Sequence, residues 1–192
     1  MPQRKPTKAA TIGKPAYSAA ALRSALTRRK KAELVELLLE LARADRGVLR
    51  QLTAQLDVAA APAELAAATR QAIADATDFD ERDMNRNFAY DYAAYDEVKR
   101  NFSRLIESGE LRLAMELSLD LMKQASYQVE MSDEGLMTQD IEECLAEVLQ
   151  ALTKCDLPPH EVVAWCAEML KCDRVGFICE RELAALRNHF EA

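Results

Sequence analysis

The stretch "FAYDYAAYDEVKRNFSRLIESGELRLAMELSLDLM" (residues 88–122) decides the fold of this chain. On a helical wheel at about 100° per residue, Tyr92, Tyr95 and Phe102 fall within about 80° of one another. A single stripe of large rings is typical of a helix face that is buried in a core. Gly109 then allows the left-handed conformation that ends a helix, and a leucine-rich helix follows it. We therefore predict two antiparallel helices joined by a short turn, an αα-hairpin.

Two aromatic residues are candidates for a groove that binds a partner. Tyr90 falls opposite the stripe, at about 200° from Phe88, the residue from which the wheel is counted. Trp165 lies within "VVAWCAEML" (residues 162–170), on or near another apolar stripe. For Trp165, core packing and a partner-binding groove are both consistent with the sequence.

The composition predicts helices along the rest of the chain. Alanine, leucine, glutamate, lysine and arginine dominate, whereas β-branched residues are scarce. Residues 141–171 have the pattern of a second hairpin, offset from the first by about 50 residues. We predict an all-α fold of antiparallel helical hairpins, a short solenoid similar to tetratricopeptide and HEAT repeats, behind a basic N-terminal arm.

Three segments follow from this pattern. Residues 1–17 contain three prolines and lack apolar periodicity, which predicts a flexible basic arm. Residues 18–77 form an N-terminal helical segment. Residues 78–192 form the helical-hairpin segment, and we expect the two helical segments to pack as one domain.

The N-terminal segment carries its own helix signals. Ser18, Thr27 and Asp45 are candidate N-caps for successive helices. The helix after Thr27 has apolar residues at helical spacing, widened by others between them: Leu34, Val35, Leu37, Leu38, Leu39, Leu41 and Ala42. We expect more than one face of this helix to be buried.

Charge is distributed unevenly between the two ends of the chain. The net charge is −7, but residues 1–31 contain nine basic residues and no Asp or Glu. An arm of this kind is typical of proteins that bind nucleic acid or an acidic protein surface, although it can also serve solubility alone. The candidate anion- or partner-binding residues are Arg4, Lys5, Lys8, Lys14, Arg23, Arg28, Arg29, Lys30 and Lys31.

Four of these basic residues are consecutive, from Arg28 to Lys31. If Thr27 caps the next helix, four cations occupy its first turn, where the helix dipole disfavours positive charge. Backbone N–H groups and these side chains would then suit a phosphate or a carboxylate-rich surface. Alternatively, the helix begins near Ala32 and the four charges are simply solvated.

The phrase "KKAELVELLLELARADRGVLRQL" (residues 30–52) resembles a helical segment of bacterial proteins that carry SWIM zinc fingers. It also resembles a related helical family of unknown function, in which a sequence like "YDYA" (Tyr90–Ala93) precedes tetratricopeptide-like hairpins. The likeness covers about residues 20–128 and implies architecture without catalytic residues. The Cys-x-Cys and Cys-x-His pairs of a SWIM finger are absent here, so its zinc and DNA roles do not transfer.

A second stretch, "AALRSALTRRKKAELVELL" (residues 20–38), resembles a SAP motif, a small helix-loop-helix that binds DNA. The two leucine-rich helices match. The loop between them, from Leu26 to Lys30, is shorter than that motif requires.

No pattern for catalysis or for a cofactor is present. The sequence has no phosphate-binding glycine loop and only two histidines, His160 and His189, neither beside a nucleophile motif. Five cysteines invite a metal hypothesis: Cys144, Cys155, Cys166, Cys172 and Cys179. None of them forms the close Cys-x-x-Cys pair of a structural zinc site, so we expect core thiols and no metal.

The sequence therefore predicts a non-catalytic helical interaction or adaptor module. We expect a protein partner, no cofactor and no membrane insertion. The odd number of cysteines and the absence of a signal peptide favour the cytoplasm; a basic, acid-free start would also fit a mitochondrial transit peptide. The alternative function is a nucleic-acid-associated subunit that binds phosphates through the basic arm and Arg28–Lys31.

Overall fold

The computed structural model describes residues 18–56, 60–80, 90–132 and 138–191. These residues form two compact units, Met1–Leu56 and Asp57–Ala192. Every regular element among the described residues is an α-helix, which confirms the predicted all-α class. The predicted arm, residues 1–17, lies outside the described residues.

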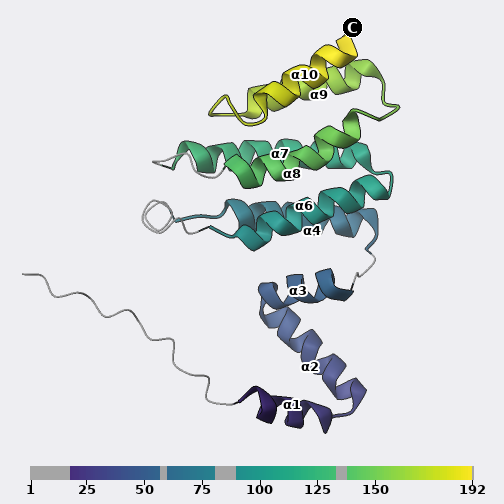
Figure 1. The fold of residues 1–192 in the computed structure, drawn as a ribbon, viewed down its shortest axis with the longest axis vertical. Helices are drawn as coiled ribbons and strands as arrows, with labels where there is room; N and C mark the ends of the chain where they lie inside the picture. The colour runs from purple at the N-terminus through teal and green to yellow at the C-terminus, as the bar shows by residue number, and fades with distance from the viewer. Residues whose placement is uncertain (1–17, 57–59, 81–89, 133–137, 192) are drawn as a thin grey trace, which may run out of the picture. The chain divides into compact units, whose positions relative to one another are not determined.

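The second unit consists of helices in successive layers (Figure 1). The helices are α4 (Pro62–Thr77), α6 (Tyr92–Glu107), α7 (Leu111–Glu130), α8 (Thr138–Leu152), α9 (Pro159–Cys172) and α10 (Glu180–Glu191). The first layer is α4 with α6, the second is α7 with α8, and the third is α9 with α10. Between layers, α4 packs on α7 and α7 packs on α9, while α6 packs on α8. A continuous core runs through all three layers.

The turn at Gly109 confirms the predicted end of α6, because its φ of +83° is left-handed. The helix pairing differs from the sequence prediction. Helix α6 contacts α7, but it packs more extensively against α4 and α8. The hairpin predicted over residues 141–171 is wrong, since α9 packs on α7 and α10 rather than on α8. A short connection makes two helices consecutive, but apolar faces decide which helices pack together.

The aromatic stripe is core at two of its three predicted positions. Tyr95 and Phe102 are buried, and Val98 lies between them on the same face of α6. Tyr92 is 53% exposed, so its predicted burial is wrong. The wheel assumed a helix that starts at Phe88, which lies outside the described residues. Helix α6 instead starts at Tyr92, capped by the Asp91 carboxylate, and the Tyr92 ring lies against Tyr90.

The first unit contains α1 (Ala19–Thr27), α2 (Lys31–Ala44) and α3 (Arg46–Leu56). Ser18 caps α1 and Asp45 caps α3, as predicted, because each side chain accepts hydrogen bonds from the first-turn backbone. The predicted cap at Thr27 is wrong. Thr27 ends α1, and its hydroxyl donates back to carbonyl groups of that helix.

The boundary between the units also differs from the predicted one. The units divide after Leu56, whereas we expected the N-terminal segment to extend to residue 77. Helix α4 belongs to the second unit because it packs on α6 and α7. Its buried face is mostly small, with Ala66, Ala72 and Ala76, which lets two helices approach it closely.

Candidate interaction surfaces

Helix α2 presents apolar side chains to solvent. Its residues Leu34, Leu37, Leu38 and Leu41, which we call the α2 leucine stripe, recur at i, i+3, i+4 and i+7. Leu37, Leu38 and Leu41 are 41%, 42% and 46% exposed, and Leu34 is half-buried. On this helix only Ala42 is buried. The expectation that several faces of this helix are buried is therefore wrong within the described residues.

The reason is the size of the first unit. Helix α2 packs against α3, and one neighbouring helix covers only part of an apolar circumference. Val35 and Leu39, which widen the stripe, are each 44% exposed. Contiguous exposed apolar surface of this kind marks interaction sites in soluble proteins.

A groove of about 510 Å³ runs along one side of the stripe. Leu34 and Leu37 contribute apolar surface to it. Three carboxylates of α2 line it: Glu33, Glu36 and Glu40. Arg29 lies at its start, 3.9 Å from Glu33. The groove therefore combines apolar surface with a row of negative charge.

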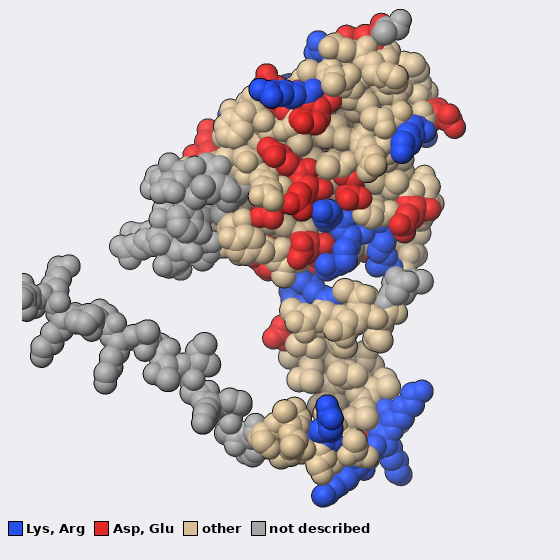
Figure 2. All heavy atoms as spheres, viewed as in Figure 1, with Lys and Arg blue, Asp and Glu red and all other residues tan. Residues whose placement is uncertain are grey.

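The predicted basic cluster forms the turn between α1 and α2. Arg28 is the C-cap of α1, Lys30 is the N-cap of α2, and Lys31 is the first residue of that helix. All four residues from Arg28 to Lys31 are exposed, as is Arg23 on α1. Figure 2 shows basic side chains around this turn and, on the face in view, a mostly uncharged surface along α2. The candidates Arg4, Lys5, Lys8 and Lys14 lie outside the described residues.

The turn does not place four cations in the first helical turn, as a start at Thr27 would. Helix α2 begins at Lys31, so three of the four charges precede it. The Lys30 backbone N–H donates to the Glu33 carboxylate at 3.2 Å, which satisfies one free donor and adds negative charge at the helix start. The helix therefore begins near the position that the alternative gave, Ala32, and not directly after Thr27.

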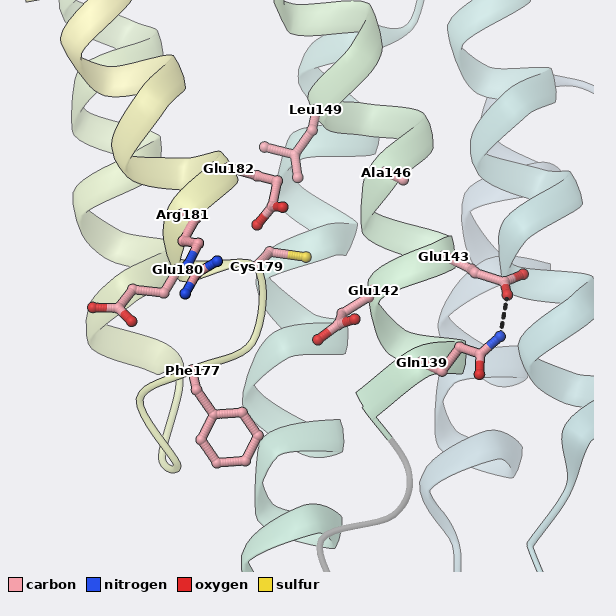
Figure 3. A pocket seen from close by; sticks show the side chains of 10 residues that line it. All are labelled: Gln139, Glu142, Glu143, Ala146, Leu149, Phe177, Cys179, Glu180, Arg181 and Glu182. Carbon is pink, nitrogen blue, oxygen red and sulfur yellow. Dashed lines mark hydrogen bonds between the residues drawn. The ribbon is translucent and has the colours of Figure 1, made fainter.

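A second groove, of about 720 Å³, lies between α8 and the start of α10 (Figure 3). Its acidic residues are Glu142, Glu143, Glu180 and Glu182, and Arg181 and the half-exposed Phe177 also line it. Burial, and secondarily the nearby Glu182 charge, raises the pKa of Glu142. Glu143 contacts Lys99 at 3.0 Å and accepts a hydrogen bond from Gln139, which also lines the groove (Figure 3).

The loop that enters α10 is held by one carboxylate. Asp173 accepts hydrogen bonds from the backbone N–H groups of Val175 at 3.0 Å and Ile178 at 2.8 Å. Cys179 follows with a φ of +52°, an uncommon conformation for a residue with a side chain. These contacts give the loop a structural role, and the groove beside it has the charge to attract cations.

The two aromatic candidates pack in or against the core. Trp165 is 5% exposed, and its indole N–H donates to the Met115 carbonyl oxygen at 2.9 Å. Of the two hypotheses for Trp165, core packing is therefore correct and the partner groove is wrong. Tyr90 is partly buried, and its hydroxyl donates to the Asp140 carboxylate. Burial first, and this hydrogen bond second, raise the pKa of Tyr90.

The cysteines are all free thiols. Cys144, Cys166 and Cys179 are buried, and burial raises the pKa of Cys144 and Cys179 to about 12 and that of Cys166 to about 11. Cys155 and Cys172 are partly exposed. Within the described ranges, no three His, Cys, Asp or Glu side chains are grouped closely enough to hold a metal ion.

The exposed stripe on α2 was the feature that sequence reasoning misjudged. A usable signal was present: α2 is apolar around much of its circumference, but its neighbours are short helices that bury little.

None of the helices in the described part of the chain combines the length and apolar character needed to cross a membrane. Comparison of the chain with family models, with curated proteins and with solved structures found no match.

Proposed function

We propose that this protein is a non-catalytic interaction or adaptor module that binds a partner protein through the first unit. The observation that carries this proposal is the exposure of the α2 leucine stripe. Burying a leucine side chain is favourable by about 1.5–3 kcal/mol. Leu37, Leu38 and Leu41 are 41–46% exposed, so covering what remains would contribute roughly 1 kcal/mol for each of them.

The second unit would serve as a helical scaffold, which we propose is a short solenoid similar to tetratricopeptide or HEAT repeats. Side-chain contacts between layers support this architecture. Arg70 contacts Glu116, Lys99 contacts Glu143, and Arg112 contacts Glu161, at separations of 46, 44 and 49 residues. A nearly constant separation is expected when similar helix pairs stack.

A capture experiment tests the adaptor function. The full chain, tagged, is used to isolate partners from lysate of its native host, with and without nuclease. We expect a protein partner that survives nuclease and is lost from the variant L37S/L38S. The control variant L56S removes a leucine that is 67% exposed but lies on α3, and it should retain the partner.

Both variants should keep the fold, because the replaced side chains are already exposed. Circular dichroism and a thermal melt check this before capture. A partner retained by L37S/L38S would contradict the assignment to α2.

The alternative function is binding of nucleic acid through the turn from Arg28 to Lys31. The exposure of all four side chains favours it, since phosphate contacts need accessible cations. A partner that disappears with nuclease, and also disappears when these four residues are replaced by alanine, would support this alternative.

A further inference from the structure

We propose that the groove along α2 holds an amphipathic helix of a partner protein, with apolar residues on one face and Lys or Arg along one flank. This inference rests on the proposed adaptor function and names the chemistry of the partner.

The spacing of the exposed leucines selects a helical ligand. Leu34, Leu37, Leu38 and Leu41 present the ridge that a second helix packs against in the helix-in-groove mode of recognition. Helix α2 has 14 residues and is therefore about 21 Å long. A partner helix of similar length, with its own apolar residues at i, i+3, i+4 and i+7, would cover the exposed stripe.

The charge beside the stripe selects a basic flank. The groove next to Leu34 and Leu37 is lined by Glu33, Glu36 and Glu40, which lie in the N-terminal two thirds of α2. A helix that enters this groove brings one flank of its surface close to these carboxylates. Lysine or arginine there would be attracted, whereas glutamate or aspartate would be repelled.

The same row of charge argues against a second copy of this chain as the occupant. On the helical wheel Glu33 and Glu40 flank the stripe on one side. In an antiparallel pair of α2 helices that flank would meet its own copy, which brings glutamate against glutamate. In a parallel pair, no Lys or Arg of α2 would come opposite Glu33 or Glu40, so that arrangement leaves the carboxylates without positive partners on the copy. The partner inferred from the structure is therefore a different, basic helix.

Two synthetic helical peptides test the inference with the full chain. Both carry leucine at i, i+3, i+4 and i+7 over about 18 residues; one has lysine along the flank and the other has glutamate at the same positions. Binding is measured by fluorescence anisotropy at low and high salt. We expect the lysine peptide to bind at least tenfold more tightly than the glutamate peptide, with the preference falling as salt rises.

Two variants separate charge from apolar contact. E36K/E40K should reverse the preference toward the glutamate peptide, a result that partial unfolding would not produce. Glu33 is left unchanged because it accepts the Lys30 N–H at the helix start. L37S/L38S should weaken both peptides at least tenfold, while L56S should bind as the parent chain does.

Three results would overturn the inference: equal affinity for the two peptides, a preference unchanged in E36K/E40K, or a dimer of the chain alone that L37S/L38S abolishes in sedimentation. The last would assign the surface to a second copy. If the capture experiment yields a partner that depends on Leu37 and Leu38, but the chain shows no preference for the lysine peptide, the adaptor function stands. Only the basic helix is then rejected.

Discussion

The Tyr95 hydroxyl donates a hydrogen bond of 2.7 Å to the Gln128 side-chain oxygen inside the core. The Gln128 amide in turn donates to the Ala76 carbonyl oxygen at 3.1 Å. Tyr95 lies on α6, Gln128 on α7 and Ala76 on α4, so one buried glutamine connects three helices. A buried polar side chain that makes all its hydrogen bonds in one arrangement favours that arrangement over others.

The substitution Y95F is expected to lower the free energy of unfolding by about 1–3 kcal/mol, because it leaves the Gln128 oxygen without its donor in the core. Urea denaturation followed by circular dichroism measures this change. Y127F is the matched control, since Tyr127 is 43% exposed and should change stability by less than about 0.5 kcal/mol. Equal effects of the two substitutions would contradict a structural role for the bond.

Two aromatic residues of the same predicted stripe should respond differently to truncation. F102A is expected to cost about 3–5 kcal/mol, because Phe102 is fully buried and its loss leaves a cavity. Y92A should cost less than about 1 kcal/mol, because that ring is 53% exposed. Thermal melts of both variants provide the comparison, and a larger loss in Y92A would show that Tyr92 is buried in solution.

Thiol labelling should separate the cysteines into two groups. At pH 8 with iodoacetamide, we expect Cys155 and Cys172 to react first, because they are partly exposed. Cys144, Cys166 and Cys179 should react much more slowly, since their sulfur atoms are buried and burial raises their pKa values. Peptide mass spectrometry over a time course identifies each site. Rapid labelling of Cys144 in folded protein would contradict the packing of α8.

The raised thiol pKa values also predict loss of stability at alkaline pH. Below about pH 8.5, folded and unfolded thiols are both protonated, so their contribution is fully present. As pH rises toward 12, the unfolded state releases protons that folded Cys144 retains. The free energy of unfolding should fall by about 1.4 kcal/mol per pH unit for each such thiol, until that thiol ionises in the folded state.

The difference between C144A and the parent chain isolates one thiol. Urea unfolding at several pH values from 8 to 11 should show a shallower decline in C144A. C155A is the control, and its decline should match that of the parent chain because Cys155 is partly exposed. Parallel declines in the parent chain and C144A would contradict a buried, protonated Cys144.

Replacing Arg28, Arg29, Lys30 and Lys31 with alanine tests the basic turn. We expect an unchanged helical circular dichroism signal, because the side chains are exposed and the Lys30 backbone can still donate to Glu33. Nucleic-acid binding by the parent chain should be weak at physiological ionic strength. Tight binding with a log–log salt slope of about −4 to −5, flattened in the variant, would instead favour the nucleic-acid function.

Local signals in the sequence were sufficient for the helical class and for several helix ends. Ser18, Asp45 and Gly109 act within one turn of their own position, so each prediction was correct. Thr27 was assigned to the wrong helix. Its hydroxyl could accept from the N–H groups of the following helix or donate to the carbonyl groups of the preceding one, and it donates to the Arg23 carbonyl oxygen of α1. The phase of the aromatic stripe was correct for Tyr95 and Phe102, which lie inside the helix, and wrong for Tyr92 at its start.

The sequence by itself determined that this protein is helical, where most of its helices lie and how its charge is divided, because these depend on residues within a few positions of one another. Only the tertiary structure decided that α6 packs mainly on α4 and α8, that Trp165 is core, and that the α2 leucine stripe remains exposed. Burial is a property of what lies across from a side chain, often more than 40 residues away, as for Trp165 and Met115. Helical periodicity marks an apolar face, but only a neighbouring helix can cover it.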